Sequence, residues 1–140
     1  MTMSQIRSLH QQALKNMDDG DFDGAKKLVY EILNFSPNYF VSYVASGLLI
    51  DVGSALRDEG MVRKGVDLLE RDFRSIIKKR RFAPRAYYNR ANGYSALFNF
   101  KLREDRCAAC FKKTELDTAK ELYRKALEYD IDNPLLAEPY

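Results

Sequence analysis

Apolar residues recur along this chain with the spacing of amphipathic α-helices. Between residues 25 and 33 they fall at positions i, i+3, i+4, i+7 and i+8, which form one face of a helix. The same spacing returns 94 residues later, between 119 and 127. No stretch alternates with period two for long enough to predict a strand, so the pattern predicts an all-α fold. The two matching patterns consist of Ala25, Leu28, Val29, Ile32 and Leu33, and of Ala119, Leu122, Tyr123, Ala126 and Leu127.

The residues between the apolar stretches predict where each helix begins and ends. Gly20-Asp21 ends the first helix, and Asp21 can cap the free amides of the second. Ser36 and Pro37 end the second helix and offer a capping hydroxyl and a first-turn proline to the third. Thr114 and Asp117 have the spacing of a capping box before the last helix. The predicted helices are 4–18, 22–35, 37–57, 61–79, 85–100 and 114–129, with turns at 58–60 and 80–84 and a polar connection at 101–113.

This arrangement resembles the tetratricopeptide repeat (TPR) family, whose repeat of about 34 residues is a helix A, a tight turn, a helix B and a proline-marked exit. The resemblance covers nearly the whole chain, as repeats 6–39, 40–85 and 86–133. It implies an α-α superhelix, a solenoid of three antiparallel helix pairs in a single domain, 1–140. The matching residues are Ile6, Leu9, Ala13, Gly20, Ala25, Val29, Ile32 and Pro37 in repeat one, Tyr43 and Gly47 in repeat two, and Gly93, Ala119, Tyr123 and Ala126 in repeat three.

Repeats two and three depart from the length of the family repeat. Repeat one spans 34 residues, whereas repeats two and three span 46 and 48. We expect the additional residues to lengthen the helices in repeat two and to form an inserted loop at 101–113 in repeat three. Gly65 and Asp72 also occupy helix B positions at which the family has small or large apolar side chains. This difference predicts altered stacking around repeat two.

The resemblance also implies a concave groove, lined by the A helices, in which members of the family bind protein segments. Here the middle of the groove is apolar and one end is cationic, which suits an amphipathic helix or extended segment that carries acidic residues. Ala45 and Ala91 replace residues of the carboxylate clamp found in chaperone-binding members, which disfavours that class. The expected groove residues are Arg7, His10, Leu14, Val44, Leu48, Asp51, Tyr87, Arg90 and Tyr94.

Charge is distributed unevenly along the chain. The net charge is +3, but residues 61–113 carry 15 Lys and Arg against 5 Asp and Glu, between flanking segments with balances of −3 and −4. The cations of residues 74–90, a stretch without any carboxylate, have two interpretations. They are a solvated helix end, where cations oppose the negative end of the helix dipole, or a patch that binds an acidic peptide or a nucleic-acid backbone. The expected basic patch consists of Lys78, Lys79, Arg80, Arg81 and Arg85.

Few residues are available for catalysis or metal binding. His10 is the only histidine, and no Gly-rich phosphate loop is present, so we do not expect an enzyme or a cofactor. Cys107 and Cys110 form a single CxxC pair, which supplies half of the ligands of a structural zinc site. We expect ordinary thiols and no metal, with zinc shared between chains and a redox role as the alternatives. The carboxylate pairs Asp18–Asp19 and Asp21–Asp23 fit helix capping and solvation.

Two expectations concern location and the end of the chain. No run approaches the roughly 20 apolar residues that cross a bilayer, and the amino terminus lacks a signal-peptide pattern. We therefore expect a cytoplasmic protein without a membrane partner. Beyond the exit at 132–134, Pro139-Tyr140 resembles the start of another helix A. A solenoid end needs a polar cap, so we expect a longer protein, of which this is the N-terminal part, or self-association through the uncapped end.

Taken together, these patterns predict a non-enzymatic scaffold that binds an acidic protein segment. Two alternatives stay open. One is a module that contacts RNA or another nucleic acid through residues 74–90, and the other is the sensor or docking domain of a longer effector enzyme.

Overall fold

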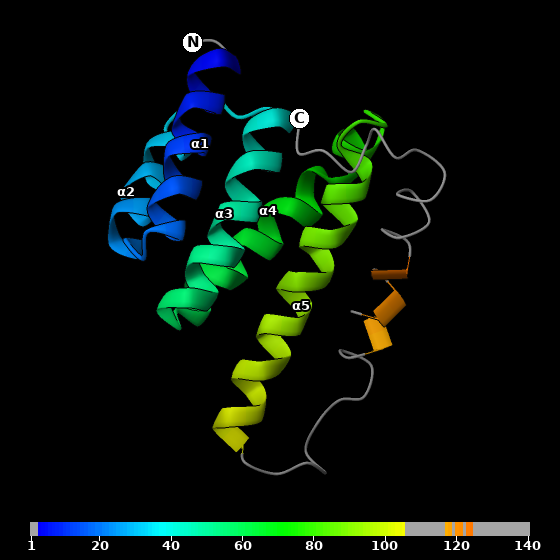
Figure 1. Ribbon diagram of the computed structural model, residues 1–140. Helices are drawn as coiled ribbons and strands as arrows, with labels where there is room; N and C mark the ends of the chain where they lie inside the picture. Colours follow the sequence, from blue (N-terminus) through cyan, green and yellow to red (C-terminus); the bar gives the residue numbers. More distant parts are fainter. Residues whose placement is uncertain (1–2, 106–116, 119, 122, 125–140) are drawn as a thin grey trace. The chain divides into compact units, whose positions relative to one another are not determined.

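The protein is helical throughout the part of the chain that the structure describes. The structure is a computed structural model that describes residues 3–105, 117–118, 120–121 and 123–124. The all-α prediction is confirmed for these residues, none of which is in a strand. Residues 117–118, 120–121 and 123–124 are helical, as expected for the predicted last helix. The long helices of Figure 1 are α1 (Met3–Asp18), α2 (Phe22–Leu33), α3 (Tyr39–Leu56), α4 (Glu59–Ile77) and α5 (Ala83–Asp105).

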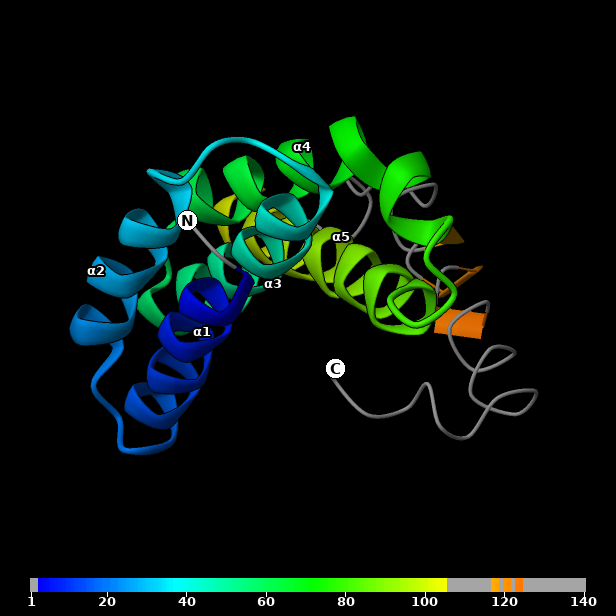
Figure 2. The same ribbon diagram turned by 90° about the horizontal axis from the view of Figure 1, so that it is seen from above.

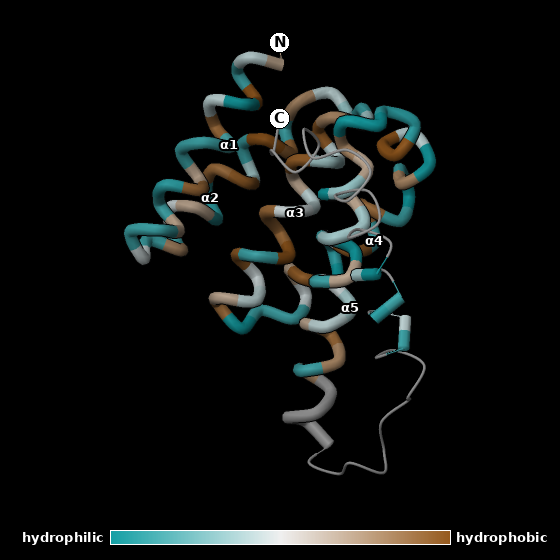
Figure 3. The backbone as a smooth tube through the Cα atoms, turned by 45° about the vertical axis from the view of Figure 1, so that its right-hand side comes forward, coloured by the Kyte–Doolittle hydropathy of each residue, from teal (hydrophilic) through white to brown (hydrophobic). Residues whose placement is uncertain are grey.

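The chain divides into two compact units, Met1–Asp72 and Phe73–Tyr140. The division falls within α4, whose first part belongs to unit 1 and whose last turn or so belongs to unit 2. In unit 1, α1, α2 and α3 pack against one another. Figure 2 shows these three helices side by side from above. Hydrophobic and hydrophilic segments alternate along α1 and α2 in Figure 3, as expected for helices with one buried face.

The turn between α1 and α2 has the predicted construction. Gly20 adopts a φ of 83°, a left-handed conformation that glycine accepts without a steric penalty. The Asp21 carboxylate then accepts a hydrogen bond of 2.9 Å from the Gly24 amide, which caps α2. Gly24 itself leaves room for this cap, since a Cβ at that position would lie 2.2 Å from Asp21 Oδ2.

The start of α3 differs from the prediction. The helix begins at Tyr39, and its cap is Asn38 rather than Ser36. Asn38 has an extended backbone, and its Oδ1 accepts hydrogen bonds of 2.9 Å from the amides of Phe40 and Val41. Pro37 therefore lies before the helix and not in its first turn.

The connection between α3 and α4 is also shorter than predicted. Residues 59 and 60 belong to α4, so the predicted three-residue turn is wrong. Arg57 closes α3 in a left-handed conformation with a φ of 56°, and the Asp58 amide reaches back to the Gly53 carbonyl at 2.8 Å. Asp58 Oδ1 then accepts a hydrogen bond from the Met61 amide at 3.1 Å, which caps α4. Arg57, which ends α3, and Asp58, which caps α4, are therefore enough to reverse the direction of the chain.

The central helix of the core is α3. All its residues from Phe40 to Gly53 are buried except Asp51, so it has no continuous polar face. The Ser46 hydroxyl donates a hydrogen bond to the Tyr43 carbonyl at 3.2 Å, and the Ser54 hydroxyl donates to the Ile50 carbonyl at 2.7 Å, so both polar groups are paired within the helix.

By length and composition alone, α3 could also cross a membrane. The expectation that no segment approaches that size and apolarity is therefore wrong for this helix. Its serines and glycines interrupt the apolar run in the sequence, but the helix as a whole stays apolar enough to meet the criterion. In the structure 72% of its residues are buried, and buried core helices meet the same criterion.

Two glycines bring α3 and α4 into close contact. A Cβ added at Gly65 of α4 would lie 2.9 Å from both Leu49 Cβ and the Ser46 carbonyl oxygen of α3. A Cβ added at Gly53 of α3 would lie 2.9 Å from a methyl group of Val62 in α4. Gly65, which departs from the family pattern, thus permits a helix spacing that a side chain would prevent.

The predicted loop at 101–113 is wrong for its first five residues. Residues 101–105 are helical and extend α5 to Asp105. This segment is polar and irregular in period, but Lys, Leu, Arg and Glu are all good helix formers. Residues 106–113, the Cys107–Cys110 pair, Thr114 and the predicted uncapped end at 132–140 lie outside the described residues.

Candidate functional site

The connection between α4 and α5 carries the predicted patch of cations. We call Lys78, Lys79, Arg80, Arg81 and Arg85 the basic surface. The first four form the turn between the two helices and are exposed, and Arg85 is half-buried in the first turn of α5. Five cations within eight residues create a concentrated positive field.

The backbone of this turn is fixed on both sides. The Lys79 amide donates to the Ile76 carbonyl at 3.1 Å, and the Phe82 amide donates to the Lys79 carbonyl at 2.8 Å. Phe82 and Ala83 are buried, with exposed fractions of 5% and 0%, and anchor the start of α5. Arg80 and Arg81 lie between these anchors, so the cations stand on a defined turn.

No carboxylate of the described residues forms an ion pair with Lys78, Arg80, Arg81 or Arg85. Unit 2 contains no Asp or Glu between 73 and 103. The positive charge of the basic surface is therefore not neutralised by neighbours in sequence.

Helix electrostatics explain only two of the five cations. Lys78 and Lys79 follow the carboxyl end of α4, where a cation is favourable by about 0.3–1 kcal/mol. Arg80, Arg81 and Arg85 lie at the amino end of α5, where the dipole disfavours a cation. Folding alone therefore does not account for three of the five cations.

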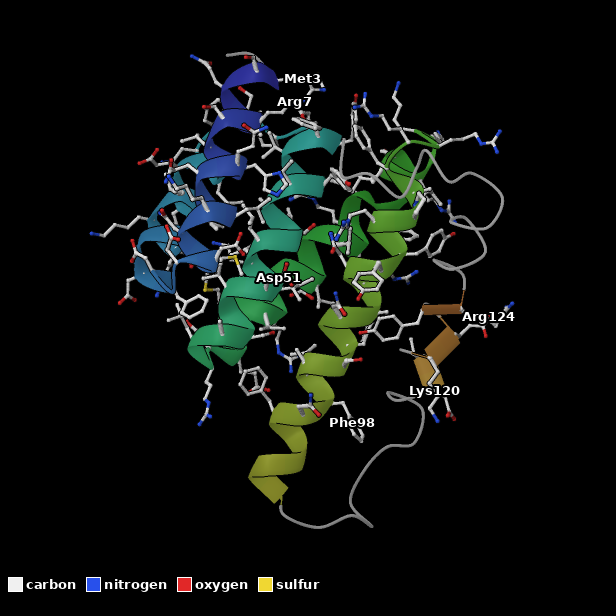
Figure 4. The ribbon with its side chains drawn as sticks, viewed as in Figure 1. Met3, Arg7, Asp51, Phe98, Lys120 and Arg124 are labelled. Atoms are coloured by element: carbon white, nitrogen blue, oxygen red, sulfur yellow. The ribbon has the colours of Figure 1, made fainter. Side chains whose placement is uncertain are left out.

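An aromatic pair lies beside Arg85. The guanidinium carbon is 5.9 Å from the ring centroid of Tyr88, which is 45% exposed. Tyr88 also meets Tyr123 edge to face, with centroids 5.5 Å apart, and the Tyr123 hydroxyl donates a hydrogen bond to Asn92 Oδ1. These contacts join residues of the 117–124 segment to α5. Lys120 and Arg124 of that segment are exposed (Figure 4).

The predicted groove residues of α1 are half-buried. They are Arg7, His10 and Leu14. The Arg7 guanidinium carbon lies 5.6 Å from the ring centroid of Phe40, the second residue of α3. Arg7 Nε is buried and has no hydrogen-bond partner among the described residues. This cation therefore packs on the core and is only partly presented to solvent.

The predicted groove residues of α3 have different surroundings. Val44 and Leu48 are 2% and 1% exposed, so they belong to the core and offer almost no surface to a ligand. The repeat spacing assigned them to a groove because it assumes an α3 with one open face, whereas every residue of α3 from 40 to 50 is buried. Asp51, on the same helix, is exposed (Figure 4).

Two of the predicted groove residues of α5, Tyr87 and Arg90, pack on the Phe73 ring in unit 2. The Arg90 guanidinium carbon is 4.5 Å from the ring centroid of Phe73, and Phe73 meets Tyr87 edge to face at 4.9 Å. Tyr87 is 8% exposed, and Arg90 and Tyr94 are half-buried. Arg90 is therefore held against the Phe73 ring, in contrast to the turn cations.

A polar network that the sequence did not reveal connects α3 with α4. The Ser42 hydroxyl donates a hydrogen bond to Asp72 Oδ2, and Arg71 Nη2 donates to the same oxygen at 2.9 Å. The hydrogen bond from Arg71 lowers the pKa of the Asp72 carboxyl; partial burial raises it, and the hydrogen bond from Ser42 again lowers it. Ser42 and Asp72 are 30 residues apart in the sequence, so no local pattern could have indicated this contact.

The described residues contain no group of three or more His, Cys, Asp or Glu that could hold a metal ion. This finding does not extend to Cys107 and Cys110. Comparison of the chain with family models, curated proteins and solved structures finds no match. The basic surface is therefore the candidate site, and it is inferred from the structure of this chain alone.

Proposed function

We propose that this protein is a non-enzymatic scaffold that binds an acidic protein segment through the basic surface. The observation that carries the proposal is a fixed, exposed turn in which Lys78, Arg80 and Arg81 form no ion pair with a carboxylate of the described residues. Arg80 and Arg81 are the best placed of these cations, because both are exposed and neither is stabilised by a helix dipole. Carboxylates of a partner would supply the missing negative charge and form charge-assisted hydrogen bonds.

The helix pairs of the chain fit a scaffold of the TPR type. The α1–α2 hairpin, with its glycine turn and buried apolar face, supports this interpretation for repeat one, and α3 with α4 forms a second pair of longer helices. A TPR-like superhelix would present the turn between α4 and α5 at the junction of two repeats. The apolar middle of the originally expected groove is not part of the proposal, since Val44 and Leu48 are buried.

Nucleic-acid binding is the second candidate function, and a specific feature favours it. Tyr88 is 45% exposed beside the Arg85 guanidinium. Nucleobases stack on exposed aromatic rings, and arginine contacts phosphate. We rank this function second because the described residues place one such exposed ring beside Arg85, whereas single-strand binding grooves use successive aromatic platforms.

Direct binding measurements separate the two functions. We expect a labelled glutamate-rich amphipathic peptide to bind the protein saturably in fluorescence anisotropy. A labelled single-stranded RNA of equal total charge is the competitor, and its affinity should fall steeply with salt if it binds at all, because RNA releases condensed counterions. RNA binding with a steep salt slope, together with no saturable peptide binding, would favour the second candidate.

Charge reversal tests whether the basic surface is the site. The variant R80E/R81E should weaken peptide binding at least about tenfold, which corresponds to about 1.4 kcal/mol. The matched control K27E/R63E changes the net charge equally at two exposed cations of unit 1 and should leave the affinity within about twofold. Equal weakening in both variants would mean that only the overall charge of the protein matters, and the proposed site would then be wrong.

A further inference from the structure

Unit 1 carries an acidic counterpart to the basic surface. Asp18, Asp19, Asp21 and Asp23 surround the turn between α1 and α2, and we call these four residues the acidic turn. All four are exposed, and none forms an ion pair with a cation of the described residues. Like the basic surface, the acidic turn is a helix connection with a fixed backbone, here held by Gly20 and by the bond from the Asp21 amide to the Asn16 carbonyl at 2.7 Å.

The fold requires only part of this acidic charge. Asp21 caps α2, and Asp23 lies in the first turn of α2, where a carboxylate is favourable. Asp18 is the last residue of α1 and Asp19 follows it, at the helix end where the dipole disfavours negative charge. Asp18 and Asp19 are thus the acidic equivalents of Arg80 and Arg81, because both pairs are exposed and oppose the adjacent helix dipole.

We propose that the basic surface binds the acidic turn of a second copy of this chain. Charge complementarity selects this occupant, because every copy carries two exposed turns of opposite charge, and neither Arg80 and Arg81 nor Asp18 and Asp19 form an ion pair within the described part of the chain. Such a contact joins two different surfaces, so it is head-to-tail, and it produces rings or open chains of copies rather than a simple two-fold dimer. This inference rests on the proposed function, since it names one acidic segment that the basic surface recognises.

Salt and concentration are the first test. In sedimentation velocity the average mass of the protein should rise with protein concentration at low salt. It should fall towards the monomer at high salt, because screening shortens the range of exposed charge pairs to about 3 Å at 1 M salt. A protein that stays monomeric at low salt over the whole concentration range would overturn the inference.

Complementation between two variants is the decisive test. D18K/D19K brings the acidic turn from a charge of −4 to no net charge, and R80E/R81E lowers the basic surface from +5 to +1, so each should lose self-association at least about tenfold when measured alone. An equimolar mixture should form 1:1 pairs, since the unchanged basic surface of D18K/D19K can bind the unchanged acidic turn of R80E/R81E. Circular dichroism should show unchanged helical content for both, because the four positions are exposed and Asp21, the cap, is kept.

Each remaining outcome has a defined meaning. K27E/R63E is the matched control and should associate like the wild type. If the variants alone associate normally, or if their mixture stays monomeric, the proposed contact is wrong. Contact between the two turns within one chain would change monomer stability in the variants without any dependence on concentration, and this result would also overturn the inference.

The same variants separate this inference from the proposed function. D18K/D19K retains the basic surface and should bind the glutamate-rich peptide at least as well as the wild type. Peptide binding without self-association refutes the second copy as partner and leaves the proposed function intact. If the wild type shows neither peptide binding nor self-association, the proposed function itself is wrong.

Discussion

At the scale of single residues, a polar position that departs from the predicted repeat pattern has a structural role. The pattern predicted an apolar side chain at Asp72, and the structure pairs this residue with Ser42 and Arg71. Ser42 is 1% exposed, so its hydroxyl needs the partner that Asp72 provides. The sequence showed the departure at Asp72 but not its cause, because the partner lies on another helix.

The lowered pKa of Asp72 makes a prediction about acid stability. When the folded-state pKa is below the unfolded-state value of about 3.9, the unfolded chain binds more protons between the two values. Stability from this group is therefore fully present above about pH 4 and is lost as the pH falls through the folded-state pKa. Asp72→Asn should lower the free energy of unfolding by about 1 kcal/mol at neutral pH.

Urea denaturation between neutral and acidic pH measures this effect. The gap in stability between wild type and Asp72→Asn should narrow as the pH decreases below the unfolded-state pKa. Asp67→Asn, the same substitution at an exposed position of α4, is the matched control. A gap that stays constant down to the lowest measurable pH would show that the ionisation of Asp72 does not contribute to stability.

At the scale of helices, the sequence predicted the strongly amphipathic elements best. The bounds of α1 and the start of α2 follow from apolar spacing and from local signals at Gly20 and Asp21, and both predictions are confirmed. The first residues of α3 and α4 were placed less well. Asn38 competes in the sequence with Ser36, which has equal capping ability, and only the backbone geometry selects between them. Asp58 was assigned to a turn with Glu59 and Gly60, whereas those two residues already belong to α4.

The contact between α3 and α4 predicts opposite effects for one substitution at two positions of α4. Gly65→Ala should lower stability, because the added methyl group would meet Leu49 Cβ and the Ser46 carbonyl oxygen at 2.9 Å. Overpacking of this kind costs about 1–3 kcal/mol, which exceeds the gain of about 1 kcal/mol from the better helix former.

Gly60→Ala is the matched control in the same helix. Gly60 is exposed, and the nearest atom to its added Cβ is Asp58 Oδ1 at 3.5 Å, so this variant should be as stable as the wild type or more stable by up to about 1 kcal/mol. Chemical denaturation of the two variants measures both effects. Equal stabilisation by both substitutions would show that α3 and α4 are not closely packed at Gly65.

At the scale of the whole molecule, the candidate site was only partly predictable. Residues 78–85 are local in sequence, so their charge and their position at a turn could be read from the pattern. The groove depended on which face of α3 is open, which is a property of tertiary packing. Val44 and Leu48 are consequently core residues. The pairing of Arg90 with Phe73 also arises only when two helices meet.

The last prediction concerns how unit 1 opens. The α1–α2 hairpin is at one end of this unit, whereas α3 is buried along most of its length. Segments that bury fewer residues open with a smaller free energy, and α1 and α2 each bury fewer residues than α3. The free energy of opening should therefore be smaller for the amides of α1 than for the amides of residues 41–50 in α3. Native-state hydrogen exchange, read by mass spectrometry or NMR, measures both free energies of opening.

Gly65→Ala tests whether the two openings are distinct. Opening of the hairpin alone leaves the contact between α3 and α4 in place, so the substitution should not change exchange in α1. Exchange in α3 requires that contact to be lost, so the substitution should accelerate it about 5- to 30-fold, which corresponds to about 1–2 kcal/mol. Equal acceleration in both helices would show instead that unit 1 opens as one cooperative body, with the hairpin stabilised by the same packing as the core.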